Sequence, residues 1–129
     1  MIYLDTSAAL KLVVPEAETA SLETWIAERS GLPRISSRLL RIEMLRSVTR
    51  NAPHRMARAN VVLSAIALLS MDDIAPAAES IGDRMLRSLD AIHLATANEV
   101  RTELAAFVCY DKRLCDSARA LGLPVETPS

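Results

Sequence analysis

Two short apolar runs of this sequence each end in an aspartate. Asp5 follows residues 2–4, and Asp111 follows residues 107–110. Each aspartate stands where a buried strand is predicted to pass into a helix. Because ligands of parallel sheets bind at the carboxyl ends of the strands, both carboxylates are expected at one edge of a sheet. A simpler interpretation, that both only cap helix N-termini, is equally consistent with the sequence.

Two further acids lie in segments with helical spacing. Glu43 lies in the middle of a predicted helix over 37–50, at the border of its apolar stripe. Asp90 lies near the start of a predicted helix over 88–102, whose alanines allow close approach to a sheet. Each acid also has a simpler explanation: Glu43 can pair with Arg46, and Asp90 can compensate the helix dipole.

Four carboxylates that converge on one edge would repel one another and raise one another's pKa values. A divalent cation removes this conflict. Oxygen ligands with few histidines or cysteines select Mg²⁺ or Mn²⁺ rather than zinc, and such ions usually serve phosphate chemistry. The acids therefore predict a magnesium site, with manganese as an alternative, that acts on phosphate.

The distribution of arginine suggests a polyanionic substrate. Of the 15 cationic residues 13 are arginine, and eight of these lie between Arg29 and Arg58, where Glu43 is the only acid. Guanidinium groups bind phosphate in a bidentate manner. The net charge of −1 supplies no global attraction for nucleic acid, so a local surface must do so. Ordinary solvated helix faces in an arginine-rich chain would explain the same pattern.

The elements that must position these residues alternate between strands and helices. Strands are predicted at 1–4, 33–36, 71–74, 105–110 and 123–125. Helices are predicted at 8–14, 16–29, 37–50, 54–69, 76–86, 88–102 and 112–121. This alternation indicates an α/β fold with a parallel sheet covered on both faces, formed as one domain over residues 1–129.

The remaining composition predicts a cytoplasmic protein without a membrane partner. The N-terminus lacks a basic segment typical of secretory signals, and no apolar stretch is long enough to cross a bilayer. Cys109 and Cys115 are predicted to be reduced, packed thiols.

Four segments of the chain resemble the sequence blocks of PIN-domain ribonucleases, in particular toxins of the VapC type. The segments are residues 3–12, 36–43, 89–97 and 110–114. Their order and spacing match over essentially the whole chain. The resemblance implies a three-layer α/β/α PIN-like domain with a short central parallel sheet.

The resemblance also implies a function and a set of site residues. It implies a Mg²⁺-dependent endoribonuclease, the toxin of a toxin–antitoxin pair, that forms a homodimer and binds a VapB-type antitoxin. Its substrate would be single-stranded or looped RNA, with transfer RNA as one candidate. The catalytic and metal-binding residues would be Asp5, Glu43, Asp90 and Asp111. Thr6 would steady the site, and Asp116 matches more loosely as an additional acid. His93 is interpreted as a hydrogen-bonded packing residue.

The expected reaction is hydrolysis of an RNA phosphodiester by a water that Mg²⁺ activates, which leaves 5′-phosphate ends. One alternative is a metal-dependent phosphatase with Asp5 as the nucleophile, although such enzymes of the haloacid-dehalogenase type need a second acid where Ser7 stands. Another is a non-catalytic α/β module that binds a partner protein, in which the acids are caps and ion pairs.

Overall fold

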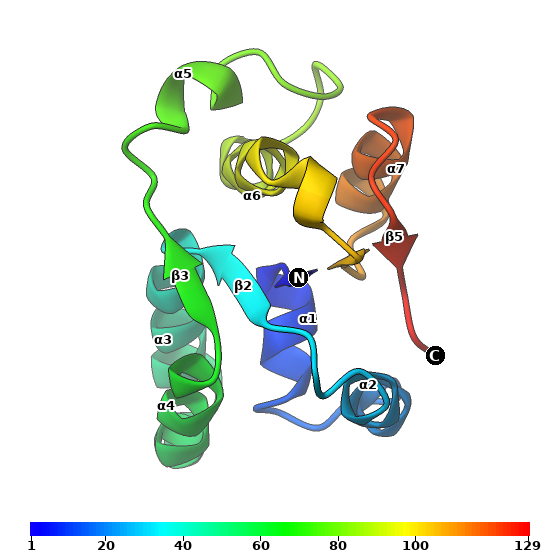
Figure 1. Cartoon of the computed structure of the whole chain (residues 1–129). Coiled ribbons are helices and arrows are strands. Elements are labelled where there is room, and N and C mark those ends of the chain that lie inside the picture. The colour runs from blue at the N-terminus through cyan, green and yellow to red at the C-terminus, as the bar shows by residue number, and fades with distance from the viewer.

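The computed structural model describes all residues, 1–129, and contains a five-stranded sheet (Figure 1). The strands are β1 (Ile2–Leu4), β2 (Arg34–Ser37), β3 (Ala67–Leu69), β4 (Ala106–Val108) and β5 (Val125–Glu126). Their order is β3-β2-β1-β4-β5, and every neighbouring pair is parallel. The predicted parallel sheet is confirmed, with β1 at its centre.

Seven α-helices and two short 3₁₀ turns connect these strands. The α-helices are α1 (Thr6–Lys11), α2 (Thr19–Ala27), α3 (Leu39–Asn51), α4 (Met56–Ser64), α5 (Ala75–Ala78), α6 (Ser88–Glu99) and α7 (Lys112–Ala120). The 3₁₀ turns are Pro53–Arg55 and Arg101–Glu103. No helix is long and apolar enough to cross a membrane.

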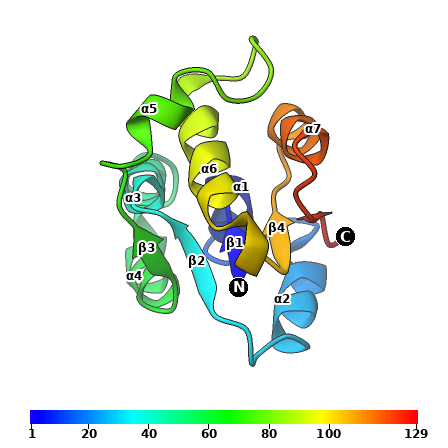
Figure 2. The same ribbon diagram turned by 45° about the horizontal axis from the view of Figure 1, so that its top comes forward.

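Alternate side chains of the central strand separate two hydrophobic cores. Ile2 and Leu4 are fully buried in a core that includes residues of α1, α2, α3 and α4. Tyr3 points to the opposite face and is buried with residues of α6 and α7. Because successive residues of a strand face opposite sides, one strand serves both cores. The predicted three-layer α/β/α arrangement is confirmed, and Figure 2 shows α6 and α7 on the side of the sheet away from α4.

The sequence misplaced two elements between α4 and α6. The third strand is β3 at Ala67–Leu69, which the sequence assigned to the end of a helix, and no strand forms at 71–74. The apolar run through this region is continuous, so it carries no local signal for the boundary between α4 and β3. The pairing of Ser37 with Leu69 sets that boundary. The predicted helix at 76–86 reduces to the short α5, and Gly82, at a φ of 77°, lies in the loop that follows it.

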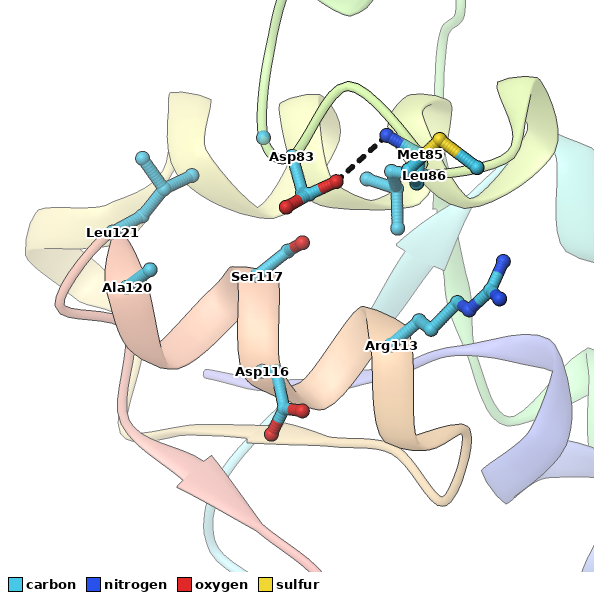
Figure 3. A pocket seen from close by; sticks show the side chains of 9 residues that line it. Asp83, Met85, Leu86, Arg113, Asp116, Ser117, Ala120 and Leu121 are labelled. Atoms are coloured by element: carbon cyan, nitrogen blue, oxygen red, sulfur yellow. Dashed lines mark hydrogen bonds between the residues drawn. The ribbon is translucent and has the colours of Figure 1, made fainter.

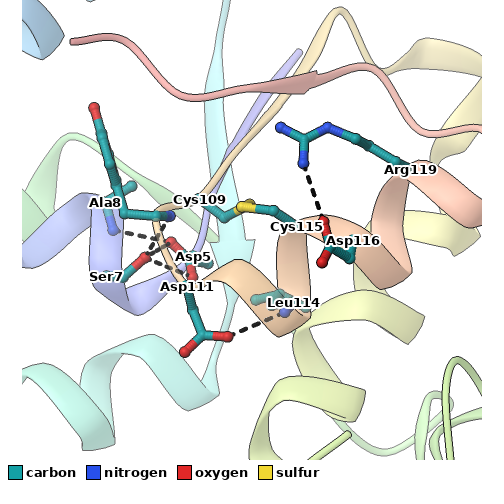
Figure 4. The surroundings of a disulfide bond; sticks show 10 residues. Asp5, Ser7, Ala8, Cys109, Asp111, Leu114, Cys115, Asp116 and Arg119 are labelled. Atoms are coloured by element: carbon teal, nitrogen blue, oxygen red, sulfur yellow. Dashed lines mark hydrogen bonds and ion pairs between the residues drawn. A yellow bond between two sulfur atoms is a disulfide. The ribbon is translucent and has the colours of Figure 1, made fainter.

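The two cysteines form a disulfide, so the prediction of reduced thiols is wrong. Cys109 follows β4, and Cys115 lies in the second turn of α7, which folds back over the strand (Figure 4). Their Cα atoms lie 6.1 Å apart, within the span of a disulfide. Cysteine usage therefore gives no support to the expectation of a reducing compartment.

Candidate active site

Asp5 is a buried carboxylate at the carboxyl end of β1. It caps the N-terminus of α1, where it accepts a hydrogen bond from the backbone N–H of Ala8 at 2.9 Å. The Ser7 hydroxyl lies 2.7 and 2.8 Å from its two carboxylate oxygens. Burial raises the pKa of Asp5 to about 6, even though the nearby His93 and these hydrogen bonds lower it. Asp5 is thus an N-cap, as the simpler interpretation held, but one whose negative charge is costly to bury.

Ser7 connects this carboxylate to the neighbouring strand. Its hydroxyl oxygen accepts a hydrogen bond from the backbone N–H of Tyr110 at 3.0 Å, directly before Asp111. Asp111 caps α7 by accepting from the N–H of Leu114 at 3.0 Å. Since β1 and β4 are paired neighbours, Asp5 and Asp111 lie at the same edge of the sheet, as Figure 4 shows.

Glu43 reaches this edge from α3 through hydrogen bonds to two other elements. Its Oε1 accepts from the Thr6 hydroxyl at 2.6 Å and lies 2.8 Å from His93 Nε2. Burial alone would raise the pKa of Glu43, but the hydrogen bonds from His93 and Thr6 lower it below its usual value, and the charges of His93 and Arg87 assist. Glu43 therefore carries a stabilised negative charge.

His93 holds Glu43 from the core side of the site. Its Nδ1 lies 2.7 Å from the Tyr3 hydroxyl, which also accepts the backbone N–H of Ser37 at 3.1 Å. An ionised Glu43 can only accept, so His93 Nε2 carries a proton and donates to it. His93 is 1% exposed. It is a hydrogen-bonded packing residue, but one that contacts a candidate site acid. Its spacing of three residues from Asp90, on one face of α6, is the sequence signal for this position.

Asp90 enters the site from the first turn of α6 and shares a cation with Asp111. Arg87 Nη2 lies 3.3 Å from Asp90 Oδ2 and 3.5 Å from Asp111 Oδ2. Burial raises the pKa of Asp90; Arg87 opposes this and the charge of Asp111 adds to it. The charge of Asp90 also contributes to the raised pKa of Asp5. Residue type and spacing did not single out Arg87.

The structure places the remaining two predicted residues differently. Thr6 lies inside the site, bonded to Glu43 and 3.0 Å from His93 Nε2. Asp116 lies on the exposed side of α7, where it pairs with Lys112 at 2.7 Å and Arg119 at 3.4 Å, and it contacts none of the other four acids. Figure 4 shows Asp116 apart from Asp5 and Asp111, beside Arg119. Asp116 therefore has the geometry of a solvated helix residue.

The four acids Asp5, Glu43, Asp90 and Asp111 therefore come from four segments and share one edge of the sheet, yet they are not gathered around a common point. No three of the chain's histidine, cysteine, aspartate or glutamate side chains are close enough to hold one metal ion together. All four acids supply oxygen ligands, the type that Mg²⁺ and Mn²⁺ bind.

Comparison with known proteins decides the family. The family model of the PIN domain matches residues 2–120. The chain belongs to the PIN-domain family. Within that family it groups with VapC proteins. It is 42% identical to Ribonuclease VapC47 of Mycobacterium tuberculosis, with 99% of this chain and 97% of the relative aligned. It is 39% identical to Ribonuclease VapC35 of the same organism, over the same shares of the two chains.

Solved structures of low sequence identity share the fold of this PIN domain. Mycobacterium tuberculosis VapC20, described as a toxin that cleaves the sarcin-ricin loop, has a TM-score of 0.72 at 18% identity, with 95% of this chain and 96% of that one covered. A toxin–antitoxin complex from Klebsiella pneumoniae has a TM-score of 0.70 at 22% identity, covering 100% and 98% of the two chains. Rickettsia felis VapBC2, bound to a promoter DNA fragment, has a TM-score of 0.70 at 14% identity over both complete chains.

Proposed function

We propose that this PIN domain is a Mg²⁺-dependent endoribonuclease and the toxin of a VapBC-type pair. The observation that carries the proposal is the placement of Asp5, Glu43, Asp90 and Asp111 at one edge of the sheet. Relatives up to 42% identical over nearly the full chain are named ribonucleases, which supports RNA as the substrate class.

The donor chemistry of these residues fits a divalent cation, although their side chains are not gathered around one point. The buried Asp5 makes no ion pair, and its pKa stays raised because His93 and the hydrogen bonds to the carboxylate offset only part of the cost of burial. Asp90 and Asp111 already share the positive charge of Arg87. We assign these three aspartates and Glu43 as the metal ligands; Mn²⁺ has the same ligand preference. When bound, the ion would lower the pKa of a water and stabilise the negative charge of the scissile phosphate.

The chain's own side chains would orient the reaction. Ser7 and the backbone of Ala8 fix the direction of Asp5, while Thr6 and His93 fix that of Glu43. Rigid acids need no rearrangement when negative charge develops on the phosphate. Attack by water rather than by the RNA 2′-hydroxyl, with cleavage of the bond between phosphorus and O3′, leaves a 5′-phosphate and a free 3′-hydroxyl.

The arginines that would hold the RNA backbone are fewer than the sequence suggested. Arg29 donates to the backbone of Trp25 at 2.8 Å, and Arg58 donates to the backbone of Leu12 at 3.0 Å. Arg34 begins β2, at the sheet edge opposite the acids. Exposed arginines at the start of α3 are better placed for phosphate contacts, namely Arg38 and Arg41.

The proposed partners are a VapB-type antitoxin and a second copy of the chain, acting in the cytoplasm. A groove of about 230 Å³ lies between α2 and α4 and is lined mostly by apolar side chains, together with Arg34, Arg58 and Glu23. Val61 is 58% exposed there, whereas Ile26, Val62 and Leu63 belong to the core. An antitoxin segment with apolar residues and an acid would match this groove.

The phosphatase alternative is less compatible with the geometry. An aspartate nucleophile needs a carboxylate oxygen that is free to attack phosphorus. Both oxygens of Asp5 lie within 2.8 Å of the Ser7 hydroxyl, and Oδ1 also accepts the N–H of Ala8. Ser7 therefore supports a fixed ligand rather than a nucleophile.

Growth arrest and RNA cleavage test the proposal together. Wild-type protein, Asp5→Asn and Asp90→Asn would be induced in cells, with Asp73→Asn, an exposed acid without contacts, as the matched control. We expect arrest and Mg²⁺-dependent cleavage by the wild type and the control only, with 5′-phosphate products. Equal arrest by all four proteins would favour the partner-binding module. Cyclic 2′,3′-phosphate ends would contradict the chemistry, and a phosphorylated Asp5 would favour the phosphatase.

A further inference from the structure

Arg87 is the only arginine or lysine that contacts the candidate site acids at their carboxylate oxygens. Its Nη2 lies 3.3 Å from Asp90 Oδ2 and 3.5 Å from Asp111 Oδ2, and its Nε lies 3.3 Å from the same oxygen of Asp90. The positive charge of Arg87 also helps to stabilise ionised Glu43. One guanidinium therefore acts on three of the four acids.

The backbone next to Arg87 is well fixed, although its side chain is not. Asp83 accepts the backbone N–H of Met85 at 2.7 Å, and Leu86 points from the same loop toward α7 across a pocket of about 680 Å³ (Figure 3). A Cβ atom at Gly82 would approach Leu86 to 3.0 Å, so this turn fits closely. The Arg87 side chain is 71% exposed and has no partner besides the two aspartates. The guanidinium can therefore leave without any change in the fold.

A divalent ion held by Asp90 and Asp111 would compete for the two carboxylates that Arg87 Nη2 now approaches. Two cations repel each other at such a short distance, so the ion and the guanidinium exclude each other there. Building on the proposed function, we infer that Arg87 is a tethered counter-ion: it holds Asp90 and Asp111 in the metal-free protein, yields to the divalent ion, and then binds an RNA phosphate.

The second half of this role follows from where the displaced side chain must lie. The backbone of Arg87 lies at the N-cap of α6, within one turn of Asp90. The displaced guanidinium therefore stays beside the acids of the candidate site, where the scissile phosphate would bind. Guanidinium groups bind phosphate oxygens in a bidentate manner and remain charged at every physiological pH. Arg87 thus neutralises the acids before the metal binds and the substrate afterwards.

Calorimetric titration of Mg²⁺ into the free protein tests this role without reference to activity. We expect Arg87→Ala to bind Mg²⁺ about two- to fivefold more tightly than the wild type, the range set by an exposed ion pair. Its KM for RNA should rise about tenfold, because a charged hydrogen bond to the substrate is lost. Arg84→Ala, which removes an exposed arginine of the same loop that makes no ion pair, should change neither value.

The outcomes separate this inference from the proposed function. If wild-type protein binds Mg²⁺ and Arg87→Ala binds it no more tightly, Arg87 is a surface ion pair and the inference is wrong, while the metal-dependent nuclease stands. An equal gain in Arg84→Ala would show a general charge effect and would also overturn the inference. If the wild type binds no Mg²⁺, both the role of Arg87 and the metal-dependent nuclease are wrong.

Discussion

The four candidate site acids form two pairs that the protein holds in different ways. Asp5 and Glu43, the hydrogen-bonded pair, are oriented by buried or half-buried hydrogen-bond donors: Ser7 and a backbone N–H for one, Thr6 and His93 for the other. Asp90 and Asp111, the arginine-bridged pair, are joined by a cation whose side chain is 71% exposed. The hydrogen-bonded pair is therefore fixed by contacts within the fold, whereas the arginine-bridged pair depends on an exposed guanidinium group that can change its position.

The difference has a physical reason. Hydrogen-bond donors within a core cannot be removed without leaving a buried polar group unsatisfied, so the hydrogen-bonded pair is rigid. An exposed ion pair contributes little to stability and costs little to break. A metal site assembled from both kinds of pair would have one prearranged side and one side that closes when the cation arrives.

The largest effect that would test this contrast is expected at His93. His93→Ala removes the bond to Glu43 and the hydrogen bond between the imidazole and the buried Tyr3 hydroxyl. Loss of a group that orients a metal ligand typically lowers activity by about 10- to 100-fold, and unsatisfied buried groups cost about 1–3 kcal/mol. RNA cleavage at saturating Mg²⁺ and urea denaturation would measure the two losses.

The other histidine of the chain provides the control. His54 is exposed and makes no side-chain contact, so His54→Ala should change neither activity nor stability. His93→Gln can still donate to Glu43, so it should recover part of the lost activity even where stability stays low. Full activity in His93→Ala would mean that Glu43 needs no orientation, and the contrast between the pairs would fail.

Local sequence signals were sufficient for most of the fold. Apolar runs that end in Asp5 and Asp111 predicted two neighbouring parallel strands, because strand, acid and helix start all lie within a few residues. The boundary between α4 and β3 was missed because pairing with β2, far away in the chain, decides it. The Cys109–Cys115 disulfide was missed because it depends on how α7 folds back on β4.

The candidate site shows the same division. Strand position predicted Asp5 and Asp111 at one edge, and the resemblance to PIN-domain toxins implied that Glu43 and Asp90 join them, but the roles of those acids stay predictions. The contacts that hold them could not be predicted, since Thr6 meets Glu43 across 37 residues and His93 meets Tyr3 across 90. Arg87 was missed because a single exposed arginine carries no periodic or spacing signal.

The pH dependence of stability should reveal the buried member of the hydrogen-bonded pair. The pKa of Asp5 rises from its usual 3.8 to about 6 in the folded protein. Folding therefore favours the protonated form, so this contribution to stability is complete below pH 3.8 and is lost as the pH rises through about 6. Asp5→Asn keeps a capping side chain without the charge. In EDTA at pH 8 it should be more stable than the wild type by about 2 kcal/mol.

Thermal unfolding at pH 4 and pH 8, with and without Mg²⁺, would measure this difference. The advantage of Asp5→Asn should vanish at pH 4, where Asp5 is protonated. Mg²⁺ should stabilise the wild type at pH 8 but not at pH 4, because protons compete with the metal for the carboxylate. Asp73→Asn should show no such dependence. A wild type that is more stable at pH 8 than Asp5→Asn in EDTA would show that the buried charge is already compensated.

The smallest effect is expected at Asp111, in the arginine-bridged pair. Its Oδ1 caps α7 while its Oδ2 meets Arg87, so two substitutions can separate these roles. Asp111→Asn keeps the cap and loses only an exposed ion pair, and should change the free energy of unfolding by less than about 0.5 kcal/mol. Asp111→Ala loses the cap as well, at a cost of about 1 kcal/mol.

Urea denaturation at low and high salt would distinguish the loss of the ion pair from the loss of the cap. If Asn were as costly as Ala and the cost disappeared in salt, the bridge to Arg87 would be part of the stable fold, and the two pairs would not differ in the way their contacts indicate.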